Sequence, residues 1–392
     1  MPIAEWTNWS GRQRSTPARR LAVGSEAELV AAVRAAGDEG LTVRAVGASH
    51  SHSRVAVTEG VVLDTDALSG LVGVDVDASV ATVRAGTRIF ALGPLLHEHG
   101  LALRNQGDID KQSVAGAVST GTHGTGPSLQ NLSASVRAAR IVLAGGDVVT
   151  TSPDAEPELF ELARHSLGGV GVLSEVTLAV RPAYRLHERQ WKEPPAEVFA
   201  RIDALIGATR HFEFFWDPVR DVCFCKSLTE TDAPPDALGD RPWERIGWSH
   251  EIISSVRDVL HTEMEYSVPA EIGPAAFEAV RSLIRADFPA LTWPVEYRTL
   301  AADDLWISTA SGRDTVTISV HEGVENDETP LFRACEAVLR RFEGRPHWGK
   351  VHYRSGRELA ALYDEFGRWW QLRDRFDPNG VFHTPALAAL RP

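Results

Sequence analysis

Apolar residues recur along the first part of the chain at spacings that alternate between those of a helix and those of a strand. The segment from Ser25 to Glu28 has the form of a capping box, and Leu29 and Val33 follow at helical spacing, so a helix is predicted to begin here. Runs 41–46 and 61–64 are typical of short strands. The segment between these two strands is polar and rich in histidine.

The same alternation continues to residue 182. It predicts a hairpin at 71–76 and 80–85, helices at 88–99 and 156–166, and strands at 135–143, 148–151 and 171–180. Helices and strands that interleave in this way predict an α+β domain.

The character of the chain changes after Pro182, where proline pairs and aromatic residues become more frequent. We therefore place a domain boundary at this point. The second region mixes strand patterns at 264–268 and 315–320 with helical patterns at 276–286 and 332–342, and residues 375–380 are predicted to form a turn before a short hydrophobic tail.

Composition and charge narrow the class of partner. The 392 residues are 43% hydrophobic and carry a formal net charge of −13 without any run of Lys or Arg. Such a charge repels a phosphate backbone, so nucleic-acid binding is disfavoured and a small molecule is the expected partner. Residues 1–20 contain no continuous apolar segment, and Cys223, Cys225 and Cys335 show no disulfide or zinc spacing. We therefore expect a cytoplasmic protein without a membrane span.

Two segments combine glycine with serine, threonine and histidine: 47–53, which follows a predicted strand, and 113–126. Glycines let backbone N–H groups approach an anion closely, and hydroxyls add donors, so paired loops of this kind suit the diphosphate of a dinucleotide. Neither segment is a Rossmann or a Walker A sequence. On composition alone, ordinary glycine-rich turns explain the two segments equally well.

Six blocks along nearly the whole chain resemble, in order, a known family. These blocks are 46–51, 105–126, 168–178, 296–298, 312–315 and 345–350. They are similar to the vanillyl-alcohol-oxidase class of flavoproteins and, within it, to the sugar-1,4-lactone oxidase and dehydrogenase family of gulonolactone, galactonolactone and arabinonolactone enzymes, with alditol oxidases as near relatives.

The resemblance implies an α+β, two-domain FAD-binding fold of the vanillyl-alcohol-oxidase or PCMH type. It implies an FAD-binding domain at 1–182, a substrate or cap domain on an antiparallel sheet at 183–350, and a segment at 351–392 that returns to the FAD domain. By the same resemblance the cofactor-binding residues are His50, Gly47, Ala48, Ser49, Ser51, His52, Ser53, Gly107, Asp108, Ser113, Gly116, Ser119, Thr120, Gly121, Thr122, His123, Gly124, Gly169, Gly171, Val172 and Lys350.

His50 matches the histidine that bonds the flavin ring covalently in some members of the family. A neutral imidazole is a good nucleophile near pH 7, and a covalent link prevents loss of the cofactor. Two alternatives remain from the residues themselves: a histidine that only contacts phosphate, or a metal pair with His52. A metal site needs further ligands, and the sequence shows no third ligand at a recognisable spacing, so we expect no metal.

Four residues are implied to be catalytic: Glu296, Arg298, Lys350 and His321. Lys350 matches a lysine beside the flavin, where its charge would stabilise the reduced ring. Glu296 and Arg298 are two residues apart and so face the same side of a strand, which would let Glu296 accept a hydroxyl proton while Arg298 fixes the substrate. The alternatives are a solvated surface lysine and an exposed ion pair of little energetic value.

Other implied site residues depart from relatives. His321 matches a histidine of the lactone enzymes, whereas alditol oxidases have theirs two positions earlier, where this chain has Ser319; a plain core or surface histidine is the alternative. Gly107 is at the position of a gate residue, where glycine is associated with access of oxygen to the flavin. Asp108 replaces a serine that is usual there.

The sequence therefore predicts an FAD-dependent oxidoreductase that oxidises a hydroxyl of a small sugar-1,4-lactone, with transfer of hydride to the flavin and reoxidation by O2 or another electron acceptor. An alditol oxidase, a non-catalytic flavin-binding protein and a histidine-based metal hydrolase are the alternatives. The substrate, the physiological acceptor and the oligomeric state are left open.

Overall fold

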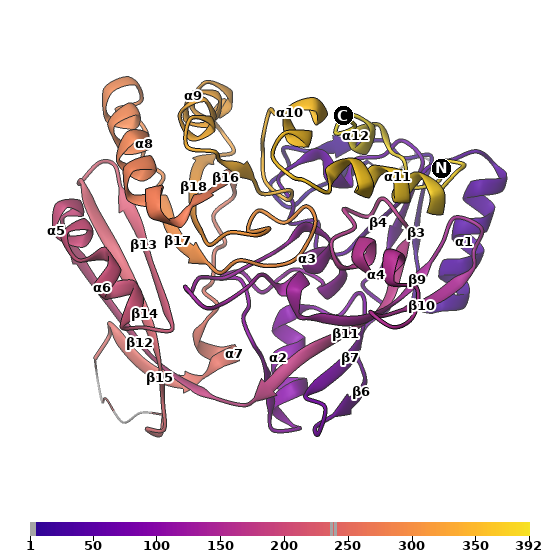
Figure 1. The fold of residues 1–392 in the computed structure, drawn as a ribbon, viewed down its shortest axis with the longest axis horizontal. Helices are drawn as coiled ribbons and strands as arrows, with labels where there is room; N and C mark the ends of the chain where they lie inside the picture. The colour runs from indigo at the N-terminus through magenta and orange to yellow at the C-terminus, as the bar shows by residue number, and fades with distance from the viewer. Residues whose placement is uncertain (1–4, 236–237, 239–240) are drawn as a thin grey trace.

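A computed structural model describes residues 5–235, 238 and 241–392. Its strands form sheets of two, three, six and eight strands. In Figure 1 the three-stranded and six-stranded sheets lie in the half drawn in indigo to magenta, and the eight-stranded sheet lies in the half drawn in pink to orange. The chain passes from the six-stranded to the eight-stranded sheet between Pro182 and Arg185.

The three-stranded sheet presents the first of the two glycine-containing segments. Strands β3 (Arg19–Ala22) and β4 (Val43–Val46) both pair in parallel with β5 (Val61–Asp64), and α1 (Glu26–Asp38) connects β3 to β4. The Ser25 side chain accepts from the N–H of Glu28, as the capping box predicts, but the Glu28 carboxylate accepts from Gly24. Segment 47–53 leaves the carboxyl end of β4, where ligands of parallel sheets commonly bind.

The six-stranded sheet has the order β10-β9-β11-β7-β6, with β8 paired to β11. The predicted hairpin, helices and strands are confirmed; the bounds are β6 (Leu71–Asp75), β7 (Val80–Arg84), α2 (Ile89–His97), β9 (Val136–Val142), β10 (Val148–Thr151), α4 (Pro157–Arg164) and β11 (Val172–Pro182). The short strand β8 (Leu101–Leu103) was not predicted. β11 includes Pro182 instead of stopping before it, because a proline at the last position of a strand removes no central hydrogen bond.

The second glycine-containing segment is not a loop throughout, which corrects the prediction. It begins with helix α3 (Val114–Thr120), whose N-cap is Ser113 and whose C-cap is Gly121 in the left-handed conformation, with φ of 72°. Val114, Ala117 and Val118 form the buried face of this helix. Tertiary burial of this short apolar face outweighs the low helix propensity of glycine, serine and threonine.

The eight-stranded sheet is antiparallel and has the order β15-β12-β14-β13-β17-β18-β16-β19. Helices α5 (Pro195–Ala200), α6 (Ile202–Gly207), α8 (Gly273–Asp287) and α9 (Thr329–Arg340) contribute to the hydrophobic core on one face. The strands are β12 (Arg185–Glu193), β13 (His211–Asp217), β14 (Val222–Thr231), β15 (Glu244–Trp248), β16 (His261–Pro269), β17 (Val295–Leu300), β18 (Thr315–Gly323) and β19 (Arg345–Pro346).

The two faces of this sheet differ in chemistry. Phe214 and Tyr297 are cross-strand partners in the apolar core under the helices. Because side chains alternate along a strand, their neighbours Phe215 and Glu296, which also pair, point to the opposite face. We call this opposite side the polar face; it lies toward the first half of the molecule.

Residues after the eight-stranded sheet return to the first half. Helices α10 (Gly356–Ala360), α11 (Phe366–Phe376) and α12 (Pro385–Ala388), yellow in Figure 1, lie beside the indigo N-terminal elements. Trp369 and Leu387 belong to the same core as β7 and β11. The turn predicted at 375–380 begins only after Phe376, because α11 continues to that residue.

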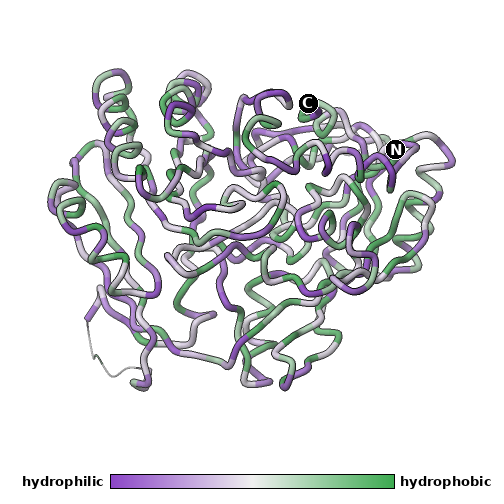
Figure 2. Tube along the Cα trace, viewed as in Figure 1, coloured by the Kyte–Doolittle hydropathy of each residue, from purple (hydrophilic) through white to green (hydrophobic). Residues whose placement is uncertain are grey.

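The remaining strands and α-helix are β1 (Trp6–Thr7), β2 (Arg14–Ser15) and α7 (Ser249–Ile252), and three short 3-10 helices span Arg54–Ala56, Leu132–Ser135 and Ala270–Ile272. Apolar stretches, green in Figure 2, occur in both halves of the molecule, in agreement with separate cores. Within the described part of the chain, no helix has the length and apolar character needed to cross a bilayer. Cys223, Cys225 and Cys335 are buried and free.

Candidate active site

A cleft of about 1040 Å³, counted to its open mouth, lies where segment 47–51 meets α3 and the start of β11. Among the predicted FAD-binding residues it is lined by Gly47, Ala48, Ser49, His50, Ser51, Ser113, Gly116, Ser119, Thr120, Thr122, Gly171, Val172 and Lys350. A Cβ at position 47 would overlap the Ser113 hydroxyl, so the two segments meet at a distance that only glycine allows. We call this space the glycine-lined cleft.

His50 enters the glycine-lined cleft with a defined orientation. Its ring stacks on Trp9, with centroids 5.0 Å apart and planes at 21°. The Trp9 backbone N–H also donates to the carbonyl of Ser49, whose φ of 55° is left-handed. Burial, followed by the charge of Lys350, lowers the pKa of His50 to about 4. The imidazole is therefore neutral at pH 7, the form in which it is a nucleophile.

Eight of the predicted FAD-binding residues do not line the cleft. Gly107, Asp108 and His123 line a neighbouring space instead, and the other five are His52, Ser53, Gly121, Gly124 and Gly169. The N–H groups of His52 and Ser53 donate to the carbonyl of Gly349, and the Ser53 hydroxyl donates to that of Trp348, so they tie segment 47–53 to block 345–350. Gly121 ends α3 and lies against His165, and Gly169 lies against Leu387 and Trp369. A Cβ at Gly124 would overlap the Gln106 carbonyl.

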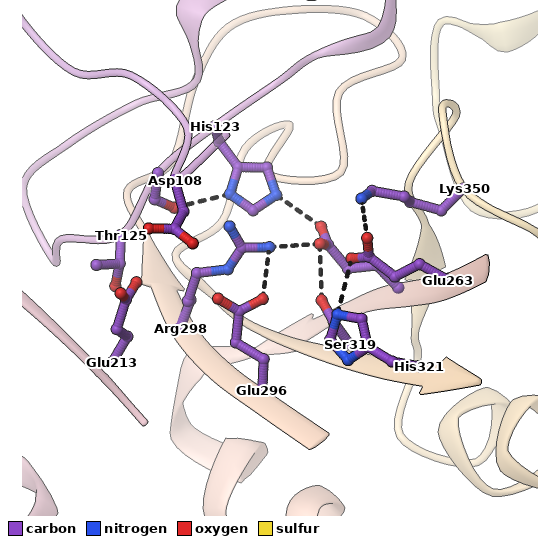
Figure 3. A network of polar contacts seen from close by, with 12 residues as sticks. Asp108, His123, Thr125, Glu213, Glu263, Glu296, Arg298, Ser319, His321 and Lys350 are labelled. Atoms are coloured by element: carbon purple, nitrogen blue, oxygen red, sulfur yellow. Dashed lines mark hydrogen bonds and ion pairs between the residues drawn. The ribbon is translucent and has the colours of Figure 1, made fainter. Parts of the chain in front are cut away.

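A second space of about 530 Å³ adjoins the cleft and shares Gln112, Thr122, His347 and Lys350 with it. It lies on the polar face of the eight-stranded sheet. The predicted residues that line it are Gly107, Asp108, Thr122, His123, Glu296, Arg298, His321 and Lys350. We call it the polar cavity; Figure 3 shows its side chains from several strands converging. The structure thus brings all four residues predicted to be catalytic to one place.

Arg298 is the centre of a buried charge network (Figure 3). Its Nη2 lies 2.5 Å from Glu265 Oε2 and 3.3 Å from Glu296 Oε2. Glu265 also contacts His123 Nε2 at 2.7 Å and accepts from the Ser319 hydroxyl at 2.8 Å. These partners overcome burial and hold the pKa of Glu265 well below its usual range. Arg298 is therefore already neutralised by Glu265.

Glu296 has the opposite electrostatic character. Only 4% of the residue is exposed, and burial raises its pKa to about 8, because the attraction of Arg298 is weaker than the cost of desolvation and Glu213 adds repulsion. Most of Glu296 is thus protonated at pH 7, and it loses its proton near pH 8. A pKa near the working pH is what a general base requires.

Lys350 forms an ion pair with Glu263 of β16 at the junction of cleft and cavity. Although burial opposes ionisation, Lys350 and His321 hold the pKa of Glu263 well below its usual range. His321 Nε2 lies 3.8 Å from Glu263 Oε1, and its Nδ1 lies 2.8 Å from the carbonyl of Pro294. Lys350 and His321 were predicted separately, and both lie next to Glu263, which was not predicted.

Asp108 is an anchor for a neighbouring segment. It accepts from the Ser255 hydroxyl at 2.7 Å and from Arg257 Nε at 2.7 Å, and Lys226 Nζ lies 3.3 Å away. These cations overcome burial and hold the pKa of Asp108 well below its usual range. Arg257 lines the polar cavity. An aspartate at position 108 thus holds segment 253–257 beside the cavity.

Glu263, Glu265, Arg257 and His347 also line the cavity and were not predicted. A signal for two of them existed: Glu265 and Ser267 alternate with apolar residues in the predicted strand 264–268, and Glu263 extends this alternation one residue before it. Arg257 and His347 lie outside any periodic element, so their place in the cavity depends on tertiary structure alone.

Three groups of histidine and glutamate have ligand atoms within 4.8 Å of one another: His52 with His261 and Glu263, His123 with Glu265 and His347, and Glu263 with Glu296 and His321. The spacing of residues in the sequence did not reveal the third member of any of these groups. Each group contains a glutamate that is already ion-paired with Lys350 or Arg298. Because Lys350 and Arg298 already neutralise the glutamates that would attract a metal ion, these groups suit ion pairs better than metal binding.

The glycine-lined cleft fits FAD by its own chemistry. The backbone N–H groups of Ala48, Ser49 and His50 donate to no other described residue, so they are free for an anionic ligand. Hydroxyls of Ser113 and Thr122 line the same space. These donors suit a diphosphate, and the junction with the polar cavity would place the reactive ring of the cofactor beside Lys350.

The comparisons with known proteins agree with this geometry. Residues 17–152 match the FAD binding domain family, and residues 176–246 and 238–389 match the D-arabinono-1,4-lactone oxidase family. The fold is that of cholesterol oxidase from Brevibacterium sterolicum, with a TM-score of 0.86 at 18% identity over 99% of this chain and 96% of the other. The protein is therefore an FAD-binding oxidoreductase with the vanillyl-alcohol-oxidase fold, as predicted.

The chain belongs to the D-arabinono-1,4-lactone oxidase family of sugar-lactone oxidases and dehydrogenases. It is 36% identical to L-gulono-1,4-lactone dehydrogenase of Mycobacterium tuberculosis over 96% of both chains. It is 31% identical to alditol oxidase of a Streptomyces species over 98% of both chains. The family predicted from six sequence blocks is confirmed.

Proposed function

We propose that this protein oxidises a hydroxyl group of a small sugar-1,4-lactone, with FAD held in the glycine-lined cleft and bonded covalently to His50. The observation that carries the proposal is the pair Glu296 and Arg298 in the polar cavity, where burial raises the pKa of the glutamate to about 8 beside a fixed cation. Relatives named as lactone dehydrogenase and lactone oxidase support the substrate class.

In this mechanism Glu296 takes the proton from the substrate hydroxyl. Arg298, already neutralised by Glu265, orients the substrate oxygen with its remaining N–H donors instead of adding a free charge. FAD, when bound, supplies the acceptor for the hydride that leaves the carbon bearing this hydroxyl. Lys350 keeps a positive charge where the cleft meets the cavity, and Glu263 fixes its position.

His321 favours a lactone over an alditol. It lies in the polar cavity, whereas Ser319, at the position of the alditol oxidase histidine, donates to Glu265. Anaerobic reduction of the purified flavoprotein by gulono-1,4-lactone, arabinono-1,4-lactone, xylitol and sorbitol tests this. We expect the lactones to bleach the flavin with the higher kcat/KM. Faster bleaching by the alditols would favour an alditol oxidase, and no bleaching by any of the four would favour a non-catalytic flavoprotein.

The covalent link predicts a simple result for His50→Ala. After precipitation in acid, the wild-type pellet stays yellow, whereas the variant releases all its flavin to the supernatant, because no other nucleophile replaces the imidazole. Trp9→Ala is the partner variant: loss of the stacked ring loosens His50, so we expect a lower fraction of bound flavin. A colourless wild-type pellet would contradict the covalent link and leave non-covalent FAD binding intact.

A substitution at Gly107 tests whether O2 reaches the flavin through this position. A Cβ at this position would lie 3.3 Å from Thr122 Cγ2 and 3.4 Å from the His123 carbonyl, so Gly107→Ala is a tight but possible fit that narrows the cavity. We expect slower reoxidation by O2, followed by stopped flow, and little change in anaerobic reduction. If both rates are unchanged, position 107 is not a gate, and an acceptor other than O2 becomes the better candidate.

We also propose that the enzyme is cytoplasmic. Its support is that Cys223, Cys225 and Cys335 are all buried as free thiols, which suits a reducing compartment.

A further inference from the structure

A groove of about 1370 Å³, counted to its open mouth, lies on the polar face of the eight-stranded sheet beside the polar cavity. The function proposed above does not use it. Its floor is formed by β12, β13 and β14, and its rim includes Trp243 before β15 and Arg257 after α7. We call it the sheet groove.

The sheet groove is continuous with the active site. Arg257 lines both the groove and the polar cavity. Glu296 is the cross-strand partner of Phe215, which in turn pairs with Phe224, and Phe224 pairs with Lys192. This row crosses four neighbouring strands on one face. At about 4.8 Å per strand, the row spans about 14 Å from Glu296 to Lys192, which is long enough for two sugar rings.

Most charges of the sheet groove are already paired. Arg245 forms an ion pair with Glu188, Lys226 lies 3.2 Å from Glu213, and Arg257 donates to Asp108, which lies in the cavity. Lys192 forms no ion pair with a described residue and lies over the Phe224 ring. A charged ligand would have to break one of these pairs or be held by Lys192 alone. An uncharged ligand with many hydroxyl groups would instead use the N–H donors that project from them.

Aromatic rings supply the remaining surface of the sheet groove. Trp243 is 56% exposed at the rim, and Phe215 and Phe224 lie on the floor. Arg257 lies 4.5 Å from the Phe215 ring centroid and Lys192 lies 4.6 Å from that of Phe224, so each ring is held beside a donor. Apolar rings with a few placed polar groups are typical of small-ligand sites, and they match the C–H faces and hydroxyls of a sugar.

We propose that the sheet groove is a second subsite of the active site, which binds an uncharged sugar or polyol unit attached to the molecule whose hydroxyl is oxidised. The natural substrate is then a glycosylated lactone or polyol. This inference rests on the proposed function, because Glu296 defines the end of the row at which oxidation occurs.

Matched ligand pairs test the subsite on the flavin-loaded protein: sorbitol against maltitol, which is sorbitol carrying one glucose, and gulono-1,4-lactone against a glucosyl derivative of it. Binding is measured by anaerobic calorimetry and turnover by flavin reduction. We expect the glucosylated member to bind about tenfold more tightly, a difference that adds to whatever the reactive end contributes.

Two exposed groove residues give the variants, Trp243→Ala and Gln190→Ala, and Phe90→Ala removes an exposed aromatic ring from α2 as the control. The groove variants should lose the tenfold preference and keep the affinity for sorbitol and gulono-1,4-lactone, and the control should change neither. Equal affinity within both pairs, or a preference that survives Trp243→Ala, would overturn the subsite. If no ligand reduces the flavin, the proposed function fails, but calorimetry still decides the subsite.

Discussion

Glu296→Gln lowers the rate of anaerobic flavin reduction by about 10²- to 10⁴-fold, the range that loss of a general base produces. Glutamine has the shape of the protonated acid, and the pKa of about 8 means that Glu296 is protonated in the resting protein at pH 7. Flavin content and fold should therefore be retained. Stopped-flow reduction at saturating substrate measures the effect.

The same residue predicts two opposite pH dependences. For the wild type, kcat/KM should rise with pH and level off above about 8, because the base acts only when deprotonated. Stability should change the other way: between the ordinary pKa of 4.5 and the folded value of about 8, the folded protein holds a proton that the unfolded chain releases, so the free energy of unfolding falls as pH rises.

Glu296→Gln should remove both dependences, so the Tm of the variant relative to the wild type should increase from pH 5 to pH 9. Glu213→Gln is a matched control for small lactones, because it changes a nearby buried carboxyl that repels Glu296 and lines the sheet groove instead of the polar cavity. It should shift the rise in kcat/KM to lower pH and keep most of the turnover. A Glu296→Gln enzyme with wild-type reduction rates would rule out the assigned base.

Lys350→Met has the second large effect, because it leaves Glu263 buried without its cation. Breaking a buried pair in this way costs about 3–5 kcal/mol of stability. Flavin reduction should also slow, because the positive charge at the junction of cleft and cavity is gone. Denaturant unfolding and stopped-flow reduction measure the two losses separately.

The double variant Lys350→Met with Glu263→Gln separates structure from function. Replacing both charges by neutral groups should restore most of the lost stability, since no uncompensated charge remains buried. Reduction should stay slow. If the double variant recovers the rate as well, Lys350 only holds the fold; if it stays as unstable as the single variant, the pair is not the source of the stability.

Much of the fold could be predicted because its elements have clear periods. Leu29 and Val33 mark α1, and the hairpin of β6 and β7 follows the alternation of apolar residues. Helix α3 was missed because Gly116, Ser119 and Thr120 have low helix propensity, and only burial of Val114 and Val118 stabilises it. β8, with three residues, is too short for any period.

The site was predictable to the extent that its residues lie in recognised blocks. Glu296 and Arg298 share a face because they are two apart on β17, and this geometry is local. Their different roles are not local: Arg298 is neutralised by Glu265 from β16, and Glu296 is kept neutral by burial. No spacing in the sequence brings Glu265 next to Arg298, because the two strands are separated in the sheet by β18.

The hydrogen bonds from His52 and Ser53 to Trp348 and Gly349 have a consequence for the order of maturation. Residues 47–53 are synthesised nearly 300 positions before the block that holds them, so on a ribosome the anchor histidine emerges long before its surroundings are complete. If His50 carries the flavin, its full surroundings, which include Lys350, are present only once block 345–350 has folded against segment 47–53. Flavin attachment then reports that the whole chain has folded.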